Sequence, residues 1–139
     1  MYSTLKENLK KSKNRCFACG EGNPDGLRLK FQYDPQTRIA STQLRLPSRY
    51  QGATGFSHGG IIATLLDEAM AKANGMAGIR AVTLKMTVSY RKMVPLLHQL
   101  NLSGWRTARK GRKIYLRSEL RDANQNLLAE ARGLFLQIL

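Results

Sequence analysis

The chain has 139 residues, of which 42% are hydrophobic and 23% charged, and its 23 Lys and Arg against 9 Asp and Glu give a net charge of +14. The length suits one domain with its own core, and no apolar run approaches the roughly 20 residues that span a bilayer. The first residues lack a hydrophobic stretch typical of a signal peptide, so we expect a cytoplasmic protein. The net charge favours binding to polyanions, although a solvated basic surface explains most of these residues more simply.

The first 15 residues are polar and rich in lysine, with Leu5 and Leu9 as apolar anchors. This composition predicts a basic arm or a short helix at residues 1–15. The next segment, CFACGEGNPDGLRLKF, places Asn-Pro, Asp-Gly and two further glycines close together. These are turn signals, and we expect a loop that leads into a strand.

Cys16 and Cys19 are the only cysteines in the sequence. A structural zinc ion needs four ligands, and neither a second cysteine pair nor histidines at finger-like spacing follow, so we assign no metal to the chain. We expect reduced thiols with a structural role in the turn. A redox pair and a metal site completed across a dimer are the alternatives that the spacing leaves open.

The rest of the chain alternates between strand and helix signals. Alternation of apolar and polar residues predicts a hairpin of two strands, and one long helical pattern follows, which Asn74-Gly75 closes. Four more strand patterns come after the helix, with turns at Gly111 and at 123–126. This order indicates an α+β fold in which an antiparallel sheet wraps one helix. The expected strands are 27–33, 38–46, 81–91, 100–110, 112–122 and 127–139, and the expected helix is 59–74.

The predicted helix carries two adjacent acids, Asp67 and Glu68, within the otherwise apolar segment GFSHGGIIATLLDEAMAKANG. Its apolar residues cover about 200° of the helix circumference, and Glu68 lies on the remaining arc, four residues from Lys72. Asp67 lies at the margin of the apolar arc, where a carboxylate is unfavourable unless it is paired or used in chemistry. Pairing with a backbone donor or an arginine is the structural alternative to a catalytic role for Asp67.

The start of the same helix carries His58, Gly59 and Gly60. Backbone N–H groups at a helix N-terminus stabilise an anion or a developing oxyanion. His58 and Asp67 lie nine residues apart, which is about 13 Å along a helix, so one helix does not bring its own pair together. If the two cooperate, a two-fold dimer places Asp67 of one chain against the His58 end of the other.

The sequence resembles hotdog-fold acyl-CoA thioesterases of the phenylacetate-pathway (PaaI-like) type. The residues that carry the resemblance are CFACGEGNPDGLRLKF, YQGATGFSHGGIIATLLDEAM, AVTLKMTVSYRKMVP and GLFLQIL, so that it covers nearly all of residues 16–139. It implies one hotdog domain at 16–139, with a long central helix wrapped by a curved antiparallel sheet, in homodimers or dimers of dimers.

The resemblance also implies roles for four residues in thioester hydrolysis. Asp67 is expected to be the general base or nucleophile, and the Gly59 N–H to polarise the thioester carbonyl. His58 is expected to hold the thioester or its turn in place, and Thr83 to steady the attacking water.

Further residues are expected to bind the substrate. Coenzyme A would enter as part of that substrate, so we expect no separate cofactor. Some relatives carry an asparagine where this chain has Gly52, and Gln51 is the candidate replacement. The basic residues at a strand end and at a hairpin tip are candidates for the phosphates of CoA. The full expected set is Gln51, Gly60, Glu68, Arg91, Lys92, Arg109 and Arg112.

Other functions and partners remain open on the sequence alone. One is a non-catalytic acyl-CoA-binding protein in which Asp67 is structural, and another is an acyl-CoA hydratase, which usually has a different acid and histidine arrangement. Nucleic-acid binding is motivated by the charge, but no RNA-recognition signature or basic helix supports it. An acidic acyl carrier protein is a further candidate thioester donor, and we expect no membrane partner. The acyl group is left open.

Overall fold

The computed structural model describes residues 14–138. The chain divides into two compact units, one that ends at Lys30 and one that begins at Phe31. The predicted basic arm at 1–15 lies almost entirely outside the described residues. Within residues 14–138, no helix is both long and apolar enough to cross a membrane.

The described part of the first unit is a series of turns, as its glycines predict. The strand predicted at 27–33 is wrong over its first five residues. Arg28 has a φ of 52°, a left-handed conformation that interrupts an extended chain. The N–H groups of Leu27 and Leu29 donate to the carbonyls of Phe17 and Ala18 in the same unit, not to a sheet partner.

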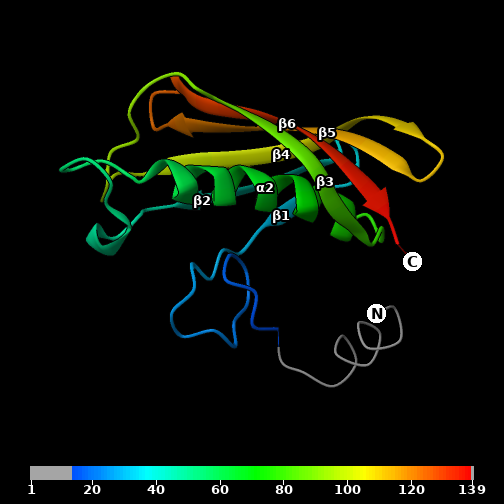
Figure 1. Cartoon of the computed structure of the whole chain (residues 1–139), viewed down its shortest axis with the longest axis horizontal. Helices are drawn as coiled ribbons and strands as arrows, with labels where there is room; N and C mark the ends of the chain where they lie inside the picture. The colour runs from blue at the N-terminus through cyan, green and yellow to red at the C-terminus, as the bar shows by residue number, and fades with distance from the viewer. Residues whose placement is uncertain (1–13, 139) are drawn as a thin grey trace. The chain divides into compact units, whose positions relative to one another are not determined.

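The second unit is a six-stranded antiparallel sheet with one long helix along it (Figure 1). The strand order is β1-β2-β4-β5-β6-β3, so β3, which follows the helix, forms one edge. This arrangement confirms the predicted α+β hotdog fold. The elements are β1 (Gln32–Asp34), β2 (Ile39–Leu44), the 3-10 helix η1 (Ser48–Tyr50), α2 (Gly59–Gly75), β3 (Ala81–Tyr90), β4 (Leu100–Lys110), β5 (Lys113–Asp122) and β6 (Leu127–Gln137).

The helix α2 lies very close to the sheet because two strands carry glycine beneath it. A Cβ atom on Gly104 of β4 would lie 2.3 Å from the Ala69 carbonyl oxygen, and one on Gly133 of β6 would lie 2.7 Å from the Met70 sulfur. Both distances are too short for a side chain, so glycine permits the contact. The residues of α2 buried against the sheet are Ile62, Leu65, Leu66, Ala69, Met70, Ala73 and Asn74.

The C-terminal end of α2 differs from the sequence-based expectation. The helix ends at Gly75, close to the predicted Asn74-Gly75 stop, but the left-handed residue is Gly78, with a φ of 80°. The Ile79 N–H donates to the Asn74 carbonyl at 2.9 Å and so satisfies one of the last helical carbonyls. Gly78, not Gly75, therefore turns the chain toward β3.

The predicted turns between the later strands are both confirmed. Gly111, with a φ of 62°, joins β4 to β5. In the β5–β6 turn the Asp122 carboxylate accepts from the N–H groups of Asn124 and Asn126, each at 2.9 Å, and the left-handed residue is Gln125. These bonds to the charged form lower the pKa of Asp122, with the side-chain bond from Asn126 as the largest cause.

The edge strand β3 is ten residues long and pairs with β6 through nine of them. Leu84 is an extra residue in this ladder, because Thr83 pairs with Phe135 and Lys85 pairs with the preceding residue of β6. This β-bulge bends the strand next to Thr83. Val82 and Leu84 are 42% and 52% exposed, so the edge presents both apolar side chains and unpaired backbone groups.

We predict that Gly104→Ala lowers the free energy of unfolding by about 1–3 kcal/mol, because the new methyl group meets the helix backbone. Gly75→Ala is the matched control, since no atom lies within 4 Å of a Cβ there. It removes a helical glycine and is expected to raise stability by up to about 1 kcal/mol. Urea denaturation measures both, and a Gly104→Ala protein as stable as wild type would contradict the packing.

Candidate active site

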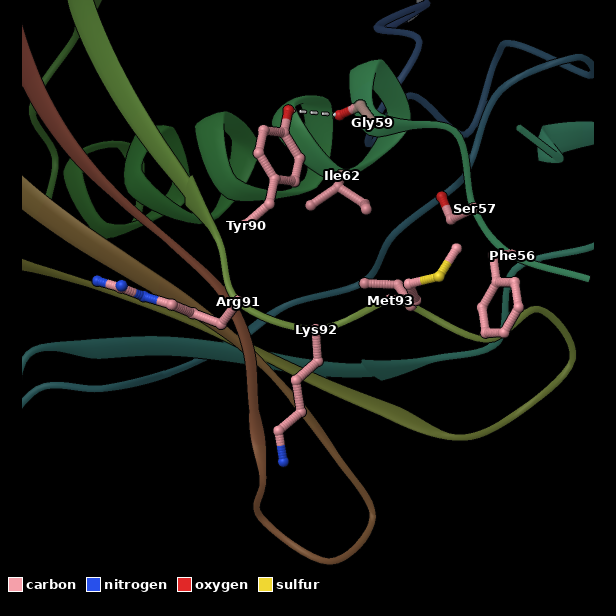
Figure 2. A pocket seen from close by; sticks show the side chains of 9 residues that line it. Phe56, Ser57, Gly59, Ile62, Tyr90, Arg91, Lys92 and Met93 are labelled. Atoms are coloured by element: carbon pink, nitrogen blue, oxygen red, sulfur yellow. Dashed lines mark hydrogen bonds between the residues drawn. The ribbon is translucent and has the colours of Figure 1, made fainter. Parts of the chain in front are cut away.

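A pocket of about 320 Å³ opens where the start of α2 meets the end of β3 (Figure 2). Its walls come from the loop before the helix, the first turn of the helix and the segment after Tyr90. Most of the lining is apolar or aromatic, as in many ligand sites. The lining residues are Phe56, Ser57, Gly59, Ile62, Tyr90, Arg91, Lys92, Met93 and Val94.

His58 is the N-cap of α2. Its Nδ1 atom accepts a hydrogen bond from the Gly60 N–H at 2.9 Å, and its carbonyl accepts from Ile61 and Ile62. The Gly60 N–H is therefore occupied by His58 within the chain. The Gly59 N–H has no acceptor among residues 14–138, and Gly59 forms part of the pocket wall. It is the donor that the helix start offers to a ligand.

Tyr90 fixes the position of Gly59 from the strand side. Its hydroxyl donates to the Gly59 carbonyl at 2.8 Å, the bond drawn in Figure 2. A Cβ atom on Gly59 would lie 3.6 Å from the Tyr90 ring, an ordinary contact. The sequence analysis did not identify Tyr90, because its only sequence signal is a position at the end of a strand. The structure adds it to the site.

The loop before α2 holds His58 in place through its backbone. The His58 N–H donates to the Tyr50 carbonyl at 2.9 Å, and the Gln51 side chain accepts from the Gly55 N–H at 2.9 Å. A Cβ atom on Gly52 would lie 2.9 Å from the His58 Cα, so a side chain such as asparagine does not fit without a shift of the backbone. Gln51 thus stabilises the loop, and Gly52 allows it to close on His58.

Asp67 and Thr83 form the second half of the candidate site. The Thr83 hydroxyl donates to Asp67 Oδ1 at 2.7 Å. Asp67 is half-buried on α2, and Thr83 is exposed on β3 beside the bulge at Leu84. The partner of Asp67 is therefore a hydroxyl group on the neighbouring strand, not an arginine. This hydrogen bond joins residues far apart in the sequence and orients the Asp67 carboxylate toward the β3 edge.

Within one chain, the two halves of the candidate site, at Gly59 and at Asp67, lie too far apart to act on one ligand group. Gly59 and Asp67 lie eight residues apart on α2, which is about 12 Å along the helix. Their partners on β3, Tyr90 and Thr83, are also apart, by seven residues or about 23 Å of extended chain. A thioester carbonyl bound at Gly59 is therefore out of reach of Asp67 in the same chain.

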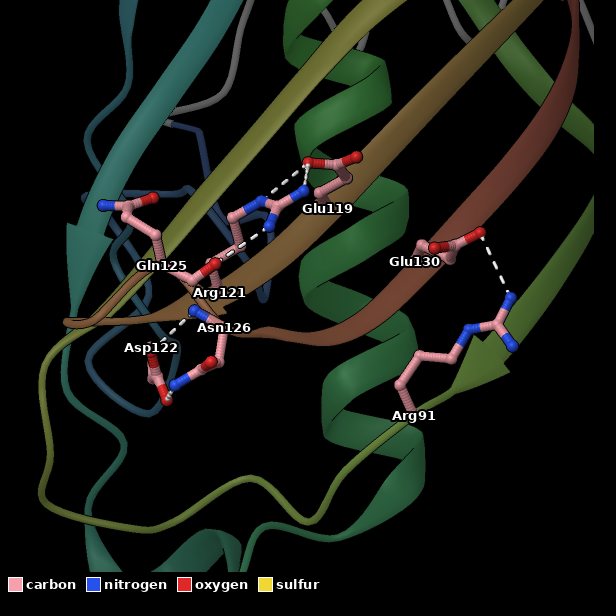
Figure 3. Close-up of polar contacts among 7 residues, drawn as sticks. All are labelled: Arg91, Glu119, Arg121, Asp122, Gln125, Asn126 and Glu130. Carbon is pink, nitrogen blue, oxygen red and sulfur yellow. Dashed lines mark hydrogen bonds and ion pairs between the residues drawn. The ribbon is translucent and has the colours of Figure 1, made fainter.

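Only some of the basic and acidic residues expected to bind substrate lie at the pocket. Arg91 and Lys92 line the pocket, and Arg91 also forms an ion pair of 3.5 Å with Glu130 (Figure 3). Glu68 is half-buried on α2 and does not line this pocket.

Arg109 and Arg112 lie at the β4–β5 hairpin, where both donate hydrogen bonds to Gln137 at the end of β6. Gln137 pairs with Ala81, at the end of β3 opposite Tyr90. The ten residues of β3 span about 30 Å. The structure therefore brings Arg91 and Lys92 to the pocket and leaves the hairpin arginines at the far end of the same sheet.

Comparison with curated proteins finds mammalian relatives. Acyl-coenzyme A thioesterase THEM4 of Bos taurus is 30% identical over 89 residues, which are 63% of this chain and 36% of that protein. Acyl-coenzyme A thioesterase THEM5 of Homo sapiens is 29% identical over 123 residues, which are 86% of this chain and 49% of that protein. The chain spans less than half of the length of these relatives.

Comparison with solved structures finds the same fold. A thioesterase superfamily protein superimposes with a TM-score of 0.83 at 22% identity, over 97% of this chain and 78% of that one. A Streptococcus mutans protein bound to acetyl CoA has a TM-score of 0.73 at 19% identity, over 79% and 88% of the chains. A variant of the phenylacetic acid degradation protein PaaI from Thermus thermophilus has a TM-score of 0.70 at 22% identity, over 79% and 93%.

A family model for the thioesterase superfamily matches residues 54–129, which is more than half of the chain. The match begins in the loop before α2 and ends at the start of β6. It therefore contains both the pocket at Gly59 and the Asp67–Thr83 pair. By this match and by its fold, the chain belongs to the thioesterase superfamily.

Proposed function

We propose that the chain is an acyl-CoA thioesterase, which hydrolyses an acyl-CoA or aryl-acyl-CoA to the free acid and CoA. The observation that carries the proposal is the Gly59 N–H, which has no acceptor among the described residues and belongs to a residue that lines a mostly apolar pocket at the positive end of α2. Thioester hydrolysis needs such a donor, because negative charge develops on the carbonyl oxygen when water attacks. The activities of the mammalian relatives support the same reaction class.

In the proposed reaction, the thioester carbonyl oxygen accepts a hydrogen bond from the Gly59 N–H. Asp67 takes a proton from a water molecule while the water oxygen attacks the carbonyl carbon, with the Thr83 hydroxyl holding the carboxylate in place. The C–S bond then breaks, and the thiolate of CoA leaves and takes up the proton. In the alternative mechanism, Asp67 itself attacks the carbonyl carbon from the same position. No cofactor beyond the CoA of the substrate takes part.

The proposed site needs two copies of the chain, because Gly59 and Asp67 of one chain are about 12 Å apart. The exposed edge of β3 offers a way to join them. If two copies of β3 pair about a two-fold axis with full overlap, Ala81 lies opposite Tyr90 of the second copy and Thr83 lies opposite Val88. Val88 is two residues, or about 7 Å, from Tyr90. Asp67 and Thr83 of one chain then face the Gly59 end of the other.

The pocket lining also bears on the acyl group. Phe56, Ile62, Met93 and Val94 contribute apolar surface, and Met93 is 57% exposed. A linear unbranched side chain such as Met93 adapts to ligands of different shape. An acyl chain or an aromatic ring fits this surface better than a charged acyl group.

We predict that Gly59→Pro lowers kcat by about 10²–10³-fold, because proline removes the N–H that polarises the carbonyl. Proline is tolerated at the first position of a helix, and His58 already has the extended conformation (ψ 139°) that a residue before proline adopts. Gly59→Ala is the matched control, since it keeps the N–H and its Cβ fits beside Tyr90. Thiol release from acyl-CoA measures both, and equal activity of the two variants would contradict the proposed donor.

We predict that Asp67→Asn lowers kcat by about 10²–10⁴-fold, because the amide cannot accept the proton of water. The amide keeps an oxygen that accepts from Thr83, so the fold is expected to remain intact. Thr83→Ser retains the hydroxyl and should retain turnover, whereas Thr83→Val should lower it. Steady-state kinetics of thiol release test the series, and a fully active Asp67→Asn enzyme would leave a non-catalytic acyl-CoA-binding role.

The two-chain site makes a quantitative prediction for mixed dimers. An Asp67→Asn chain and a Gly59→Pro chain are each inactive, but a mixed dimer contains one site with both residues intact. Refolding the two together in equal amounts should restore about a quarter of wild-type activity, because half of the dimers are mixed and each has one working site. Activity of the mixture no higher than that of its parents would place the site within one chain.

A further inference from the structure

A second hollow lies on the sheet face opposite α2, at the same end of β3 as the pocket. Its volume is about 280 Å³, and the residues that line it are Thr87, Ser89, Arg91, Glu130, Ala131 and Arg132. Side chains alternate between the two faces of a strand, so Thr87 and Ser89 point away from the helix that Val88 faces. The hollow thus presents two hydroxyl groups and two guanidinium groups on the outer face.

The charges around this hollow are not balanced within the described chain. Arg91 is paired with Glu130, as Figure 3 shows, but Arg132 contacts no acid or acceptor within residues 14–138. Arg132 also lies directly opposite Arg117 in the β5–β6 ladder, and Arg117 lacks a partner within the same residues. Like charges opposite each other destabilise a sheet, and an anion between them relieves the repulsion.

The hollow and the proposed reaction site share one lining residue. Arg91 lines both the pocket at Gly59 and the hollow, and Tyr90 precedes it in the chain. Thr87 is three residues from Tyr90, which is about 10 Å of extended strand. A ligand with its thioester at Gly59 can therefore pass around the end of β3 and reach the outer face.

We infer that this hollow binds the phosphate groups at the nucleotide end of the acyl-CoA, with Arg132 as the principal charged contact. The inference rests on the proposed function. Guanidinium groups form bidentate hydrogen bonds with phosphate, and the Thr87 and Ser89 hydroxyls supply further donors. Arg117 lies one strand farther from the hollow and extends the basic surface across the sheet.

The first test compares two thioesters of the same acyl group, one of CoA and one of pantetheine, which lacks the nucleotide. Arg132→Gln should raise KM for the CoA thioester by about 10-fold or more, as expected for the loss of a charged hydrogen bond, and leave kcat unchanged. KM for the pantetheine thioester should not change. Arg38→Gln is the matched control, because Arg38 lies at the β1–β2 turn, at the edge of the sheet opposite β3. An equal effect of Arg132→Gln on both thioesters would overturn the inference.

The second test measures binding without turnover. Trp105 is the only tryptophan, and it pairs with Arg117 on the same outer face, so its fluorescence reports on ligands bound there. Adenosine 3′,5′-bisphosphate should change this fluorescence in a saturable way, and Arg132→Gln should weaken that binding by about 10-fold or more. Inorganic phosphate that binds as tightly as the nucleotide would indicate a site for free phosphate and would overturn the assignment.

The two tests separate the inference from the proposed function. Absence of thiol release from both thioesters would contradict the proposed function, while the fluorescence titration would still decide whether the hollow binds a nucleotide phosphate. Arg132 is exposed, so its replacement should not impair folding, and thermal unfolding checks this point. Thiol release with no nucleotide binding at the hollow would overturn the inference alone.

Discussion

The close contact between α2 and the sheet is the constraint on which the rest of the structure depends. Gly104 and Gly133 remove side chains where the helix crosses β4 and β6, so that Ala69 and Met70 rest directly on the strands. This contact fixes the helix along its length. Its start therefore meets the end of β3, and its middle meets the beginning of β3. The Gly59–Tyr90 and Asp67–Thr83 pairs of the candidate site both follow from that single alignment.

The cap at the start of α2 leaves one backbone donor available to a ligand. A helix begins with N–H groups that have no acceptor inside the helix, and His58 accepts one of them through its side chain. The N–H of Gly59 remains available at the positive end of the helix dipole. The Tyr90 hydroxyl donates to the Gly59 carbonyl, so the Gly59–Gly60 peptide next to this N–H is held by His58 on one side and by Tyr90 on the other. A rigid donor needs little reorganisation when charge develops on a bound carbonyl.

The strand β3 connects these features because it pairs with β6, contacts α2 and forms an edge of the sheet. Its two ends carry Tyr90 and Thr83, which contact α2 at Gly59 and Asp67. The bulge at Leu84 bends the strand beside Thr83. An edge strand with exposed apolar residues is unfavourable in isolation, and pairing with a second copy would both cover that edge and bring the two halves of the proposed site together.

The sequence by itself determined the elements, because alternation and helical periodicity are local consequences of which face is buried. It located α2 and the four later strands to within two residues, and it marked Asp67 as an acid at the margin of an apolar face. It placed the first strand too early, since the left-handed Arg28 has no local signal. Only the tertiary structure showed Thr83 bound to Asp67, Tyr90 bound to Gly59, and Arg109 far from the pocket. These are contacts between residues distant in the chain, which local patterns do not encode and which the packing of helix against sheet decides.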